Sequence, residues 1–245
     1  MRFKLIAAAA MALAFGASAH ATEFVQNGGF ETLTGAAPAG QSFEFGASYI
    51  YGNAVANWQS NSSNAFNLLF LNTNAVDAST RFSEYGQFLW SAPGPLTGNF
   101  AALDGDSNYN GAVTQSISGL TVGNTYTLTF DWAAAQYHDR TGPTTEQLVA
   151  SIAGQNFSTA VVNNASQSST GWFGESFTFK ATQSTDVLSF LSIGTPNGMP
   201  PVALLDNVSI TGGVPEPATW GMMLVGVAGV GAIMRRRRAL GAAVA

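Results

Sequence analysis

The clearest pattern in the chain is a strict alternation of apolar and polar residues over positions 125–132. Threonine or aspartate occupies the positions between the apolar side chains, and Gly123-Asn124 precedes the segment as a turn sequence. A period of two places alternate side chains on opposite faces of a β-strand. The segment therefore predicts a strand that turns four large side chains toward a core: Tyr126, Leu128, Phe130 and Trp132.

Short apolar runs punctuated by Asn, Gly, Ser and Thr continue along most of the chain. This texture is typical of an all-β sandwich. No long linker or internal repeat interrupts it, so we expect one domain over residues 22–213. The further predicted strands are 66–71, 100–103, 112–117, 148–152, 157–162, 172–180, 187–193 and 202–210.

The N-terminal segment has the three parts of a secretory signal peptide. Arg2 and Lys4 are positively charged, residues 5–16 are apolar, and Ala19-His20-Ala21 offers small residues on both sides of a bulky one. About 12 apolar residues are too few to cross roughly 30 Å of hydrocarbon. We therefore expect signal peptidase to cleave residues 1–21 and expose Thr22 as the new N-terminus.

Charge and cysteine content narrow the possible functions of residues 22–213. Three basic side chains face thirteen acidic ones in this range, which gives a net charge of −10. Phosphate backbones need clusters of Lys and Arg, so we expect no nucleic-acid partner. The chain has no cysteine, which excludes disulfides and a thiol nucleophile.

The C-terminal segment has the pattern of a membrane-spanning tail. Pro215-Glu216-Pro217 is followed by an uncharged stretch over 218–234 and by the cluster Arg235, Arg236, Arg237 and Arg238. The prolines disfavour an earlier helix start, and the uncharged stretch is long enough for a short transmembrane helix. Arginine clusters stay in the cytoplasm, so we expect 239–245 to be a short cytoplasmic tail and the domain to lie outside.

These three parts, in this order at the end of the chain, resemble the PEP-CTERM sorting signal. The resemblance covers 214–238 and implies that an exosortase of a Gram-negative bacterium recognises Pro215, Glu216 and Pro217. The helix would then be a transient anchor in the inner membrane. It also implies release to the cell surface or to an extracellular matrix that contains exopolysaccharide. The residues after the arginines are an addition to the usual pattern.

Several short segments between the two ends resemble the galactose-binding-like jelly rolls of many PEP-CTERM and choice-of-anchor proteins. They are Asn27-Gly-Gly-Phe-Glu31, Trp58, Ala102-Leu-Asp-Gly105, Val113-Thr-Gln115 with the strand at 126–130, Trp172 with Phe177-Thr-Phe179, and Leu205-Asp-Asn-Val208. The resemblance implies a single jelly-roll β-sandwich in which Trp58, Trp132 and Trp172 belong to the core. Such folds carry many functions, so it implies no activity.

The resemblance also implies that the first and last strands lie side by side, which would bring Glu31 close to Asp206. Two carboxylates with backbone carbonyls near Asn27 and water would suit a structural calcium ion. Caps of turns are the alternative role for both carboxylates. A second candidate is the segment 104–111, which has oxygen side chains at alternate positions. It lacks the glycine and the final acid of a calcium loop, and a polar turn explains it as well.

Exposed aromatic residues are the candidates for sugar binding, because a flat ring stacks on the apolar face of a pyranose. Trp90, Tyr109 and Tyr137 fall in predicted loops and are the best placed. Ordinary packing is the alternative for each.

Catalytic motifs are missing from the sequence. His138 would be the single histidine left after signal cleavage. We therefore expect a non-enzymatic surface or matrix protein associated with exopolysaccharide or biofilm. A carbohydrate-binding module is the alternative, and a glycoside hydrolase with paired carboxylates is a third hypothesis.

Overall fold

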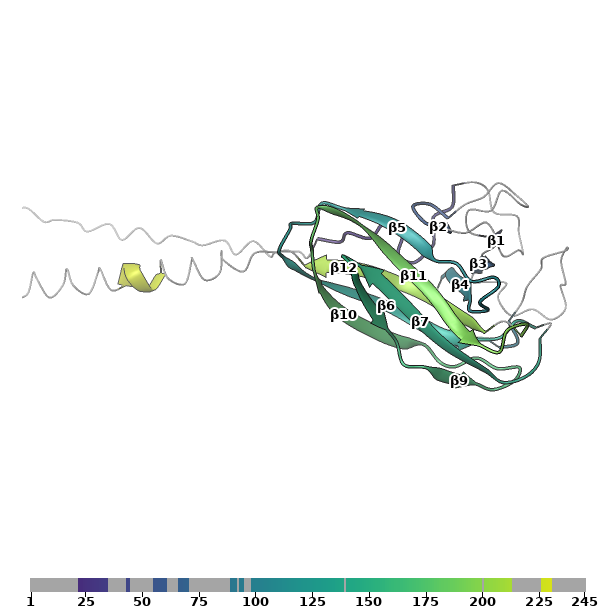
Figure 1. The fold of residues 1–245 in the computed structure, drawn as a ribbon. Helices are drawn as coiled ribbons and strands as arrows, with labels where there is room; N and C mark the ends of the chain where they lie inside the picture. The colour runs from purple at the N-terminus through teal and green to yellow at the C-terminus, as the bar shows by residue number, and fades with distance from the viewer. Residues whose placement is uncertain are drawn as a thin grey trace, which may run out of the picture. The chain divides into compact units, whose positions relative to one another are not determined.

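The structure is a computed structural model that describes residues 22–34, 43–44, 55–60, 66–70, 89–91, 93–94, 98–138, 140–199, 201–212 and 226–230. Thr22–Gly213 form one compact unit built from two antiparallel sheets (Figure 1). The strands are β1 (Phe43–Glu44), β2 (Gln59–Ser60), β3 (Asn67–Phe70), β4 (Phe100–Asp104), β5 (Val113–Ser118), β6 (Thr125–Ala135), β7 (Thr144–Ile152), β8 (Gln155–Ser158), β9 (Val162–Asn164), β10 (Phe173–Lys180), β11 (Thr185–Thr195) and β12 (Val202–Gly212).

The first sheet has the order β1-β3-β4-β12-β6-β10 and is called the β12 sheet here. Its longest ladder joins β12 to β6 and is interrupted by a bulge between Asp206 and Ser209. Along β6 the side chains predicted to face the core are buried, and the threonines between them are not. The alternation at 125–132 and the all-β sandwich that it predicted are thus confirmed.

The second sheet has the order β2-β5-β11-β7-β8, with β9 paired to β7, and is called the β11 sheet. Figure 1 shows β5, β11 and β7 side by side. Along β7 and β11 every second side chain points toward the β12 sheet, for example Leu148, Ala150, Leu188 and Phe190. The two sheets therefore enclose one apolar interior, where the Phe130 ring of β6 meets the Phe190 ring of β11 edge-on at 5.0 Å.

A second apolar cluster lies on the other face of the β12 sheet. It contains Phe70, Phe100, Tyr137 and Leu204, with Trp172 packed against it. The Phe70 and Phe100 rings stack with centroids 5.5 Å apart. At this end the β12 sheet is thus buried on both faces, which explains the continuous run of buried residues in β4.

The N-terminal segment runs beside the last strand. The Phe24 N–H donates to the Ile210 carbonyl at 3.0 Å, and the Val208 N–H donates to the Gly28 carbonyl at 3.0 Å. A Cβ atom at Gly28 would lie 1.8 Å from the Val208 carbonyl oxygen, so this approach requires glycine. The neighbour of the last strand is thus the N-terminal segment, which forms one isolated bridge between Glu23 and Thr211, whereas the first strand, β1, lies at the edge of the sheet and does not pair with β12.

The predicted strands differ from the observed ones mainly where the chain turns. The single strand expected at 157–162 is divided into β8 and β9, because the Thr159 N–H and hydroxyl bond to the Leu148 carbonyl and N–H instead of continuing the ladder. The two-residue strands β1 and β2 were not predicted. Trp58 and Trp132 are buried as expected, and Trp172 is half-buried.

The predicted targeting segments lie largely outside the described residues. This applies to the signal peptide at 1–21, to Pro215, Glu216 and Pro217, and to the arginines 235–238. Of the expected transmembrane stretch 218–234, the structure describes residues 226–230 as a helical turn. No helix within the described ranges is long and apolar enough to span a membrane.

Candidate functional site

Asn27 organises the loop that leads from the N-terminus into the sandwich. Its backbone has a left-handed φ of 54°. Its side-chain amide donates to the Thr32 and Ala56 carbonyls at 2.9 and 3.0 Å, and its Oδ1 accepts from the Thr32 N–H at 2.9 Å. The Asn27 carbonyl also accepts the indole N–H of Trp58 at 2.9 Å. These bonds fix the buried Trp58 ring at the base of the loop.

Gln115 of β5 holds the preceding residue of the same loop. Its Oε1 accepts from the Gln26 N–H and its Nε2 donates to the Gln26 carbonyl, both at 2.8 Å. The side-chain amide thereby satisfies both backbone groups of Gln26, as a neighbouring strand would. The side chain of Gln26 is left exposed beside the sheet.

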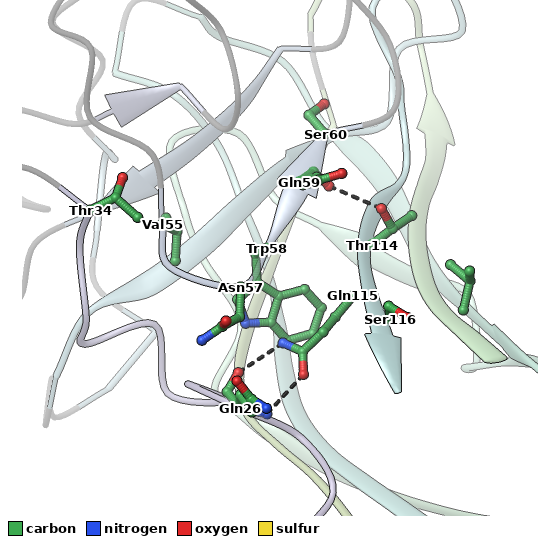
Figure 2. Close-up of a pocket in the computed structure, with 11 residues that line it drawn as sticks. Gln26, Thr34, Val55, Asn57, Trp58, Gln59, Ser60, Thr114, Gln115 and Ser116 are labelled. Carbon is green, nitrogen blue, oxygen red and sulfur yellow. Dashed lines mark hydrogen bonds between the residues drawn. The ribbon is translucent and has the colours of Figure 1, made fainter. Parts of the chain in front are cut away.

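A cleft of about 740 Å³ lies between this loop, β2 and β5 (Figure 2). Its volume falls in the range of small-molecule sites, about 300–1,000 Å³. Among the described residues, amides, hydroxyls and three apolar side chains line it, and none of these residues is ionisable. They are Gln26, Thr34, Val55, Asn57, Trp58, Gln59, Ser60, Thr114, Gln115, Ser116 and Val187.

The exposed groups of the cleft are held in place by their own elements. Asn57 is exposed and has a left-handed φ of 69°, in the turn that the Trp58 N–H closes onto the Val55 carbonyl at 3.3 Å. Gln59 is exposed on β2, and its carbonyl accepts from the Thr114 hydroxyl at 3.4 Å. The cleft therefore offers neutral donors and acceptors around an apolar base.

The aromatic residues predicted to bind sugar do not line this cleft. Tyr137 is buried, pairs with Leu89 in an isolated bridge and packs against Phe66 and Phe70. The prediction of an exposed Tyr137 is therefore wrong, because the chain that follows β6 is covered by the second apolar cluster.

Trp90 and Tyr109 lie on the surface but in different surroundings. Trp90 is half-buried, packs against His138 at a tilt with ring centroids 3.9 Å apart, and donates its indole N–H to the Arg140 carbonyl at 2.6 Å. Tyr109 is 53% exposed in the turn after β4. A sugar-binding role for either remains a prediction.

Glu31 and Asp206 are close to one another, as the jelly-roll resemblance implied. Burial is the main cause that raises the pKa of Asp206 to about 7, and the negative charges of Glu31 and Asp131 also raise it. A hydrogen bond from the Asn207 N–H acts in the opposite direction and lowers the pKa. Asp131 stands directly opposite Asp206 on the neighbouring strand, a pairing that the local sequence pattern does not predict. Like charges placed opposite one another destabilise a sheet.

A calcium ion held between Glu31 and Asp206 remains a prediction. In the described part of the chain, no three His, Asp or Glu side chains are gathered closely enough to hold a metal ion. Glu31 also accepts the Asn99 N–H at 2.7 Å, which matches the alternative role in fixing a turn. Backbone carbonyls and water would have to complete the oxygen ligands that calcium requires.

The turn after β4 uses its carboxylates for internal bonds. Asp106 accepts from the Asn108 N–H and side chain at 2.9 and 2.8 Å, and from the Gly198 N–H at 2.6 Å. These bonds outweigh the opposing effect of burial and lower the pKa of Asp106. The neighbouring Asp104 is buried, which raises its pKa to about 7. The segment is thus a polar turn that ties β4 to the loop before β12.

A buried acid of the described strands lies inside the sandwich. Glu146 of β7 is fully buried and accepts the Thr144 hydroxyl at 2.5 Å, while its second oxygen lacks a partner among the described residues. Burial raises its pKa to about 8, with the Thr144 bond acting in the opposite direction. The carboxyl is therefore protonated at neutral pH.

Family comparison places the chain in one family and identifies its tail. The model of the family described as "Protein of unknown function (DUF642)" matches residues 85–211, just over half of the chain. The chain belongs to that family. The PEP-CTERM protein-sorting motif matches residues 213–238, which confirms the resemblance seen in the sequence and implies export and membrane-linked sorting. The search of curated proteins found no match.

Solved structures with similar folds include several carbohydrate-binding modules. A structure of TmCBM61 in complex with β-1,4-galactotriose is 13% identical, with a TM-score of 0.40, and the match covers 77% of this chain and 97% of that one. A CBM4 structure is 18% identical, with a TM-score of 0.34 and coverages of 76% and 98%. The CBM22-1 xylan-binding domain from Paenibacillus barcinonensis Xyn10C is 14% identical, with a TM-score of 0.33 and coverages of 72% and 97%. These similarities are similarities of fold, and they assign no ligand to this protein.

Proposed function

We propose that this protein is exported, sorted by an exosortase, and binds neutral glycans through the cleft beside Trp58 without catalysing a reaction. The observation that carries the proposal is the lining of the cleft, which consists of amides, hydroxyls and apolar side chains. Sugar hydroxyls need hydrogen-bond donors and acceptors, and the C–H face of a sugar ring needs apolar contact.

The uncharged lining favours neutral over charged glycans. A charged ligand in the cleft would lose hydration without meeting an opposite charge, which costs free energy. The amides of Gln26, Asn57 and Gln59 each offer both donors and acceptors, and all three residues are exposed. A neutral sugar can exchange its bonds to water for bonds to these groups.

The same lining supports a non-catalytic role. Hydrolysis of a glycoside uses a pair of carboxyl groups on the two sides of the scissile bond. The described residues that line the cleft include no acid and no histidine. The cleft therefore supports binding of a glycan without its hydrolysis.

In our proposal, the sorting signal determines where in the cell envelope the domain binds glycans. Signal peptidase removes residues 1–21, the helix at 218–234 holds the chain in the inner membrane, and Arg235–Arg238 stay in the cytoplasm. An exosortase then acts at Pro215–Pro217. The domain, of net charge −10, reaches the surface or the extracellular matrix of a Gram-negative cell, where exopolysaccharide supplies the glycan.

A structural calcium ion is a second part of the proposal. Glu31 and Asp206 would hold it, because their shared negative charge is otherwise unfavourable where Asp206 is buried. The ion would tie the N-terminal loop to β12, the central element of its sheet. Its role would be in stability and not in glycan binding, since neither carboxylate lines the cleft.

Binding of soluble glycans to the full chain tests the proposed function. The chain would be kept in a zwitterionic detergent without sugar groups and titrated with neutral galactan, xylan or dextran fragments and with anionic alginate fragments. We expect at least one neutral glycan to bind and Gln59→Ala to weaken it about tenfold, as the loss of one or two hydrogen bonds would. Gln183→Ala, an exposed amide in the β10–β11 loop, is the matched control. Binding that is equal in both variants would refute the site.

A further inference from the structure

We infer that the outer face of the β11 sheet extends the cleft into a track for a neutral polysaccharide chain. The inference rests on the proposed function of the cleft and gives its ligand a class: a polymer several sugar units long, in place of a single sugar or a chain end. It depends on three observations, which are the chemistry of this face, its contrast with the other sheet, and its continuity with the cleft.

The outward side chains of β5, β11, β7 and β8 are all uncharged. The register places Ser189 of β11 between Thr114 of β5 and Ser151 of β7, and Ser151 beside Asn156 of β8. This row crosses four strands and consists of hydroxyls and one amide. The next row contains Leu191 and Val149, directly paired. The face therefore alternates hydrogen-bonding rows with aliphatic ones.

These rows do not belong to the core. Their members are exposed or half-buried, whereas the residues between them, such as Leu188, Phe190, Leu148 and Ala150, are buried. Strands lie about 4.8 Å apart, so the row from Thr114 to Asn156 spans roughly 14 Å. A surface of this length accommodates several sugar units in succession.

The lack of charge is a property of this sheet and not of the domain. In the same strongly acidic unit the outer face of the β12 sheet carries Asp131 and Asp206 side by side at one end. Its other end is covered by the second apolar cluster. The face of the β11 sheet thus matches an uncharged, hydroxyl-rich partner, because such a partner contacts it without burying an unpaired charge.

The cleft and the face share residues. Thr114 and Ser116 of β5 and Val187 of β11 line the cleft and point outward from the sheet. Val187 is 53% exposed, as an aliphatic contact for a sugar ring would be. A chain bound at Gln59 can therefore continue onto the β11 sheet without crossing a charged residue of the described strands.

The dependence of affinity on glycan length tests this track. The full chain in the same detergent would be titrated with a disaccharide, a tetrasaccharide and an octasaccharide of the neutral glycan that binds. We expect affinity to rise about tenfold or more from disaccharide to octasaccharide, which is about 1.4 kcal/mol or more. A constant affinity over this range would overturn the track and leave the cleft as the complete site.

A charge pair placed on the face gives the second test. The double variant Ser189→Lys with Ser151→Asp puts opposite charges at directly paired positions, which supports folding, but it interrupts the neutral surface. Ser176→Lys with Thr129→Asp does the same on the outer face of the β12 sheet and is the matched control. We expect the first variant to lose the gain in affinity with length while disaccharide binding stays within about twofold, and the control to bind as the unaltered chain does.

The possible outcomes separate the two proposals. If Gln59→Ala weakens binding and the charge pair on the β11 sheet has no effect on long chains, the cleft stands and the track is wrong. If no glycan responds to Gln59→Ala, the proposed function itself fails. If the charge pair instead abolishes self-association of the chain in sedimentation experiments, the face is an interface between copies and the track is overturned.

Discussion

The two sheets share one apolar interior but present different chemistry to the solvent. The β12 sheet opposes Asp131 and Asp206 across adjacent strands, and Glu31 lies close to Asp206. The β11 sheet offers serine, threonine, asparagine and aliphatic residues in register. One fold therefore separates a cation-attracting face from a neutral one. Stability of the first depends on what neutralises its charge, whereas the second can meet an uncharged ligand without electrostatic cost.

The largest expected effect tests the interior that the two sheets share. Phe130→Ala should lower the free energy of unfolding by about 3–5 kcal/mol, because this ring fills the space between β6 and β11. Thr129→Ala, one position away on the outer face, should cost less than about 0.5 kcal/mol. Urea denaturation of both variants measures this. Equal losses would mean that the faces of β6 are assigned wrongly.

The pH dependence of stability tests the buried acid of the β11 sheet. Burial raises the pKa of Glu146 from 4.5 to about 8 in the folded state. Between these values the folded chain keeps a proton that the unfolded chain releases, so stability is full below pH 4.5 and falls as the pH rises toward 8. The slope is about 1.4 kcal/mol for each pH unit.

Glu146→Gln isolates this contribution, since an amide resembles the protonated carboxyl in shape. We expect the variant to lose less stability than the unaltered chain when urea midpoints are compared at pH 5 and pH 8. A residual slope should remain, because burial also raises the pKa of Asp104 and of Asp206 to about 7. An unchanged slope in Glu146→Gln would show that this carboxyl is ionised in the folded state.

Calcium should act on the β12 sheet alone. At a free calcium concentration about a hundred times the dissociation constant, binding would add about 2.7 kcal/mol to the stability of the folded chain. Chelator should lower the melting temperature correspondingly, and Glu31→Gln or Asp206→Asn should remove most of that difference. Asp106→Asn is the control, because both carboxylate oxygens of Asp106 already accept hydrogen bonds from backbone N–H groups. Identical melting curves with calcium and with chelator would exclude the ion.

The smallest effect concerns the link between the β11 sheet and the N-terminal loop. Gln115→Ala removes two hydrogen bonds to the Gln26 backbone and should cost about 1–2 kcal/mol. It should also weaken glycan binding, since the loop forms one wall of the cleft. Thr114→Ala, the neighbour on the outer face, should change stability far less. Thermal melts and glycan titration of both variants measure the two effects.

Regular patterns in the sequence predicted the sandwich well. The alternation along β6 correctly predicted which of its residues are buried. The sorting tail could be recognised because its motifs follow one another in a specific order. The strand at 157–162 was predicted without its interruption, because the pairing of Thr159 with Leu148 depends on a neighbouring strand. Local periodicity contains no information about such partners.

The cleft could not be predicted, because its residues come from segments far apart in the chain. Gln26, Gln59 and Gln115 meet through the pairing of β2 with β5 and through side-chain bonds to the backbone. A strand of two residues such as β2 has no readable period. Sugar-binding candidates chosen by aromatic character alone therefore included Tyr137, which the fold places in a core.

The position of β12 in its sheet has a mechanical consequence. It is the last strand before the sorting tail, and it lies between β4 and β6 with hydrogen bonds on both sides. A pull on the tail therefore enters the domain along a central strand and loads two ladders in shear, so many bonds must break together. The same pull on an edge strand would peel bonds one after another. If the tail anchors the domain while the domain binds a polymer, as we propose, this arrangement of β12 would resist the resulting tension.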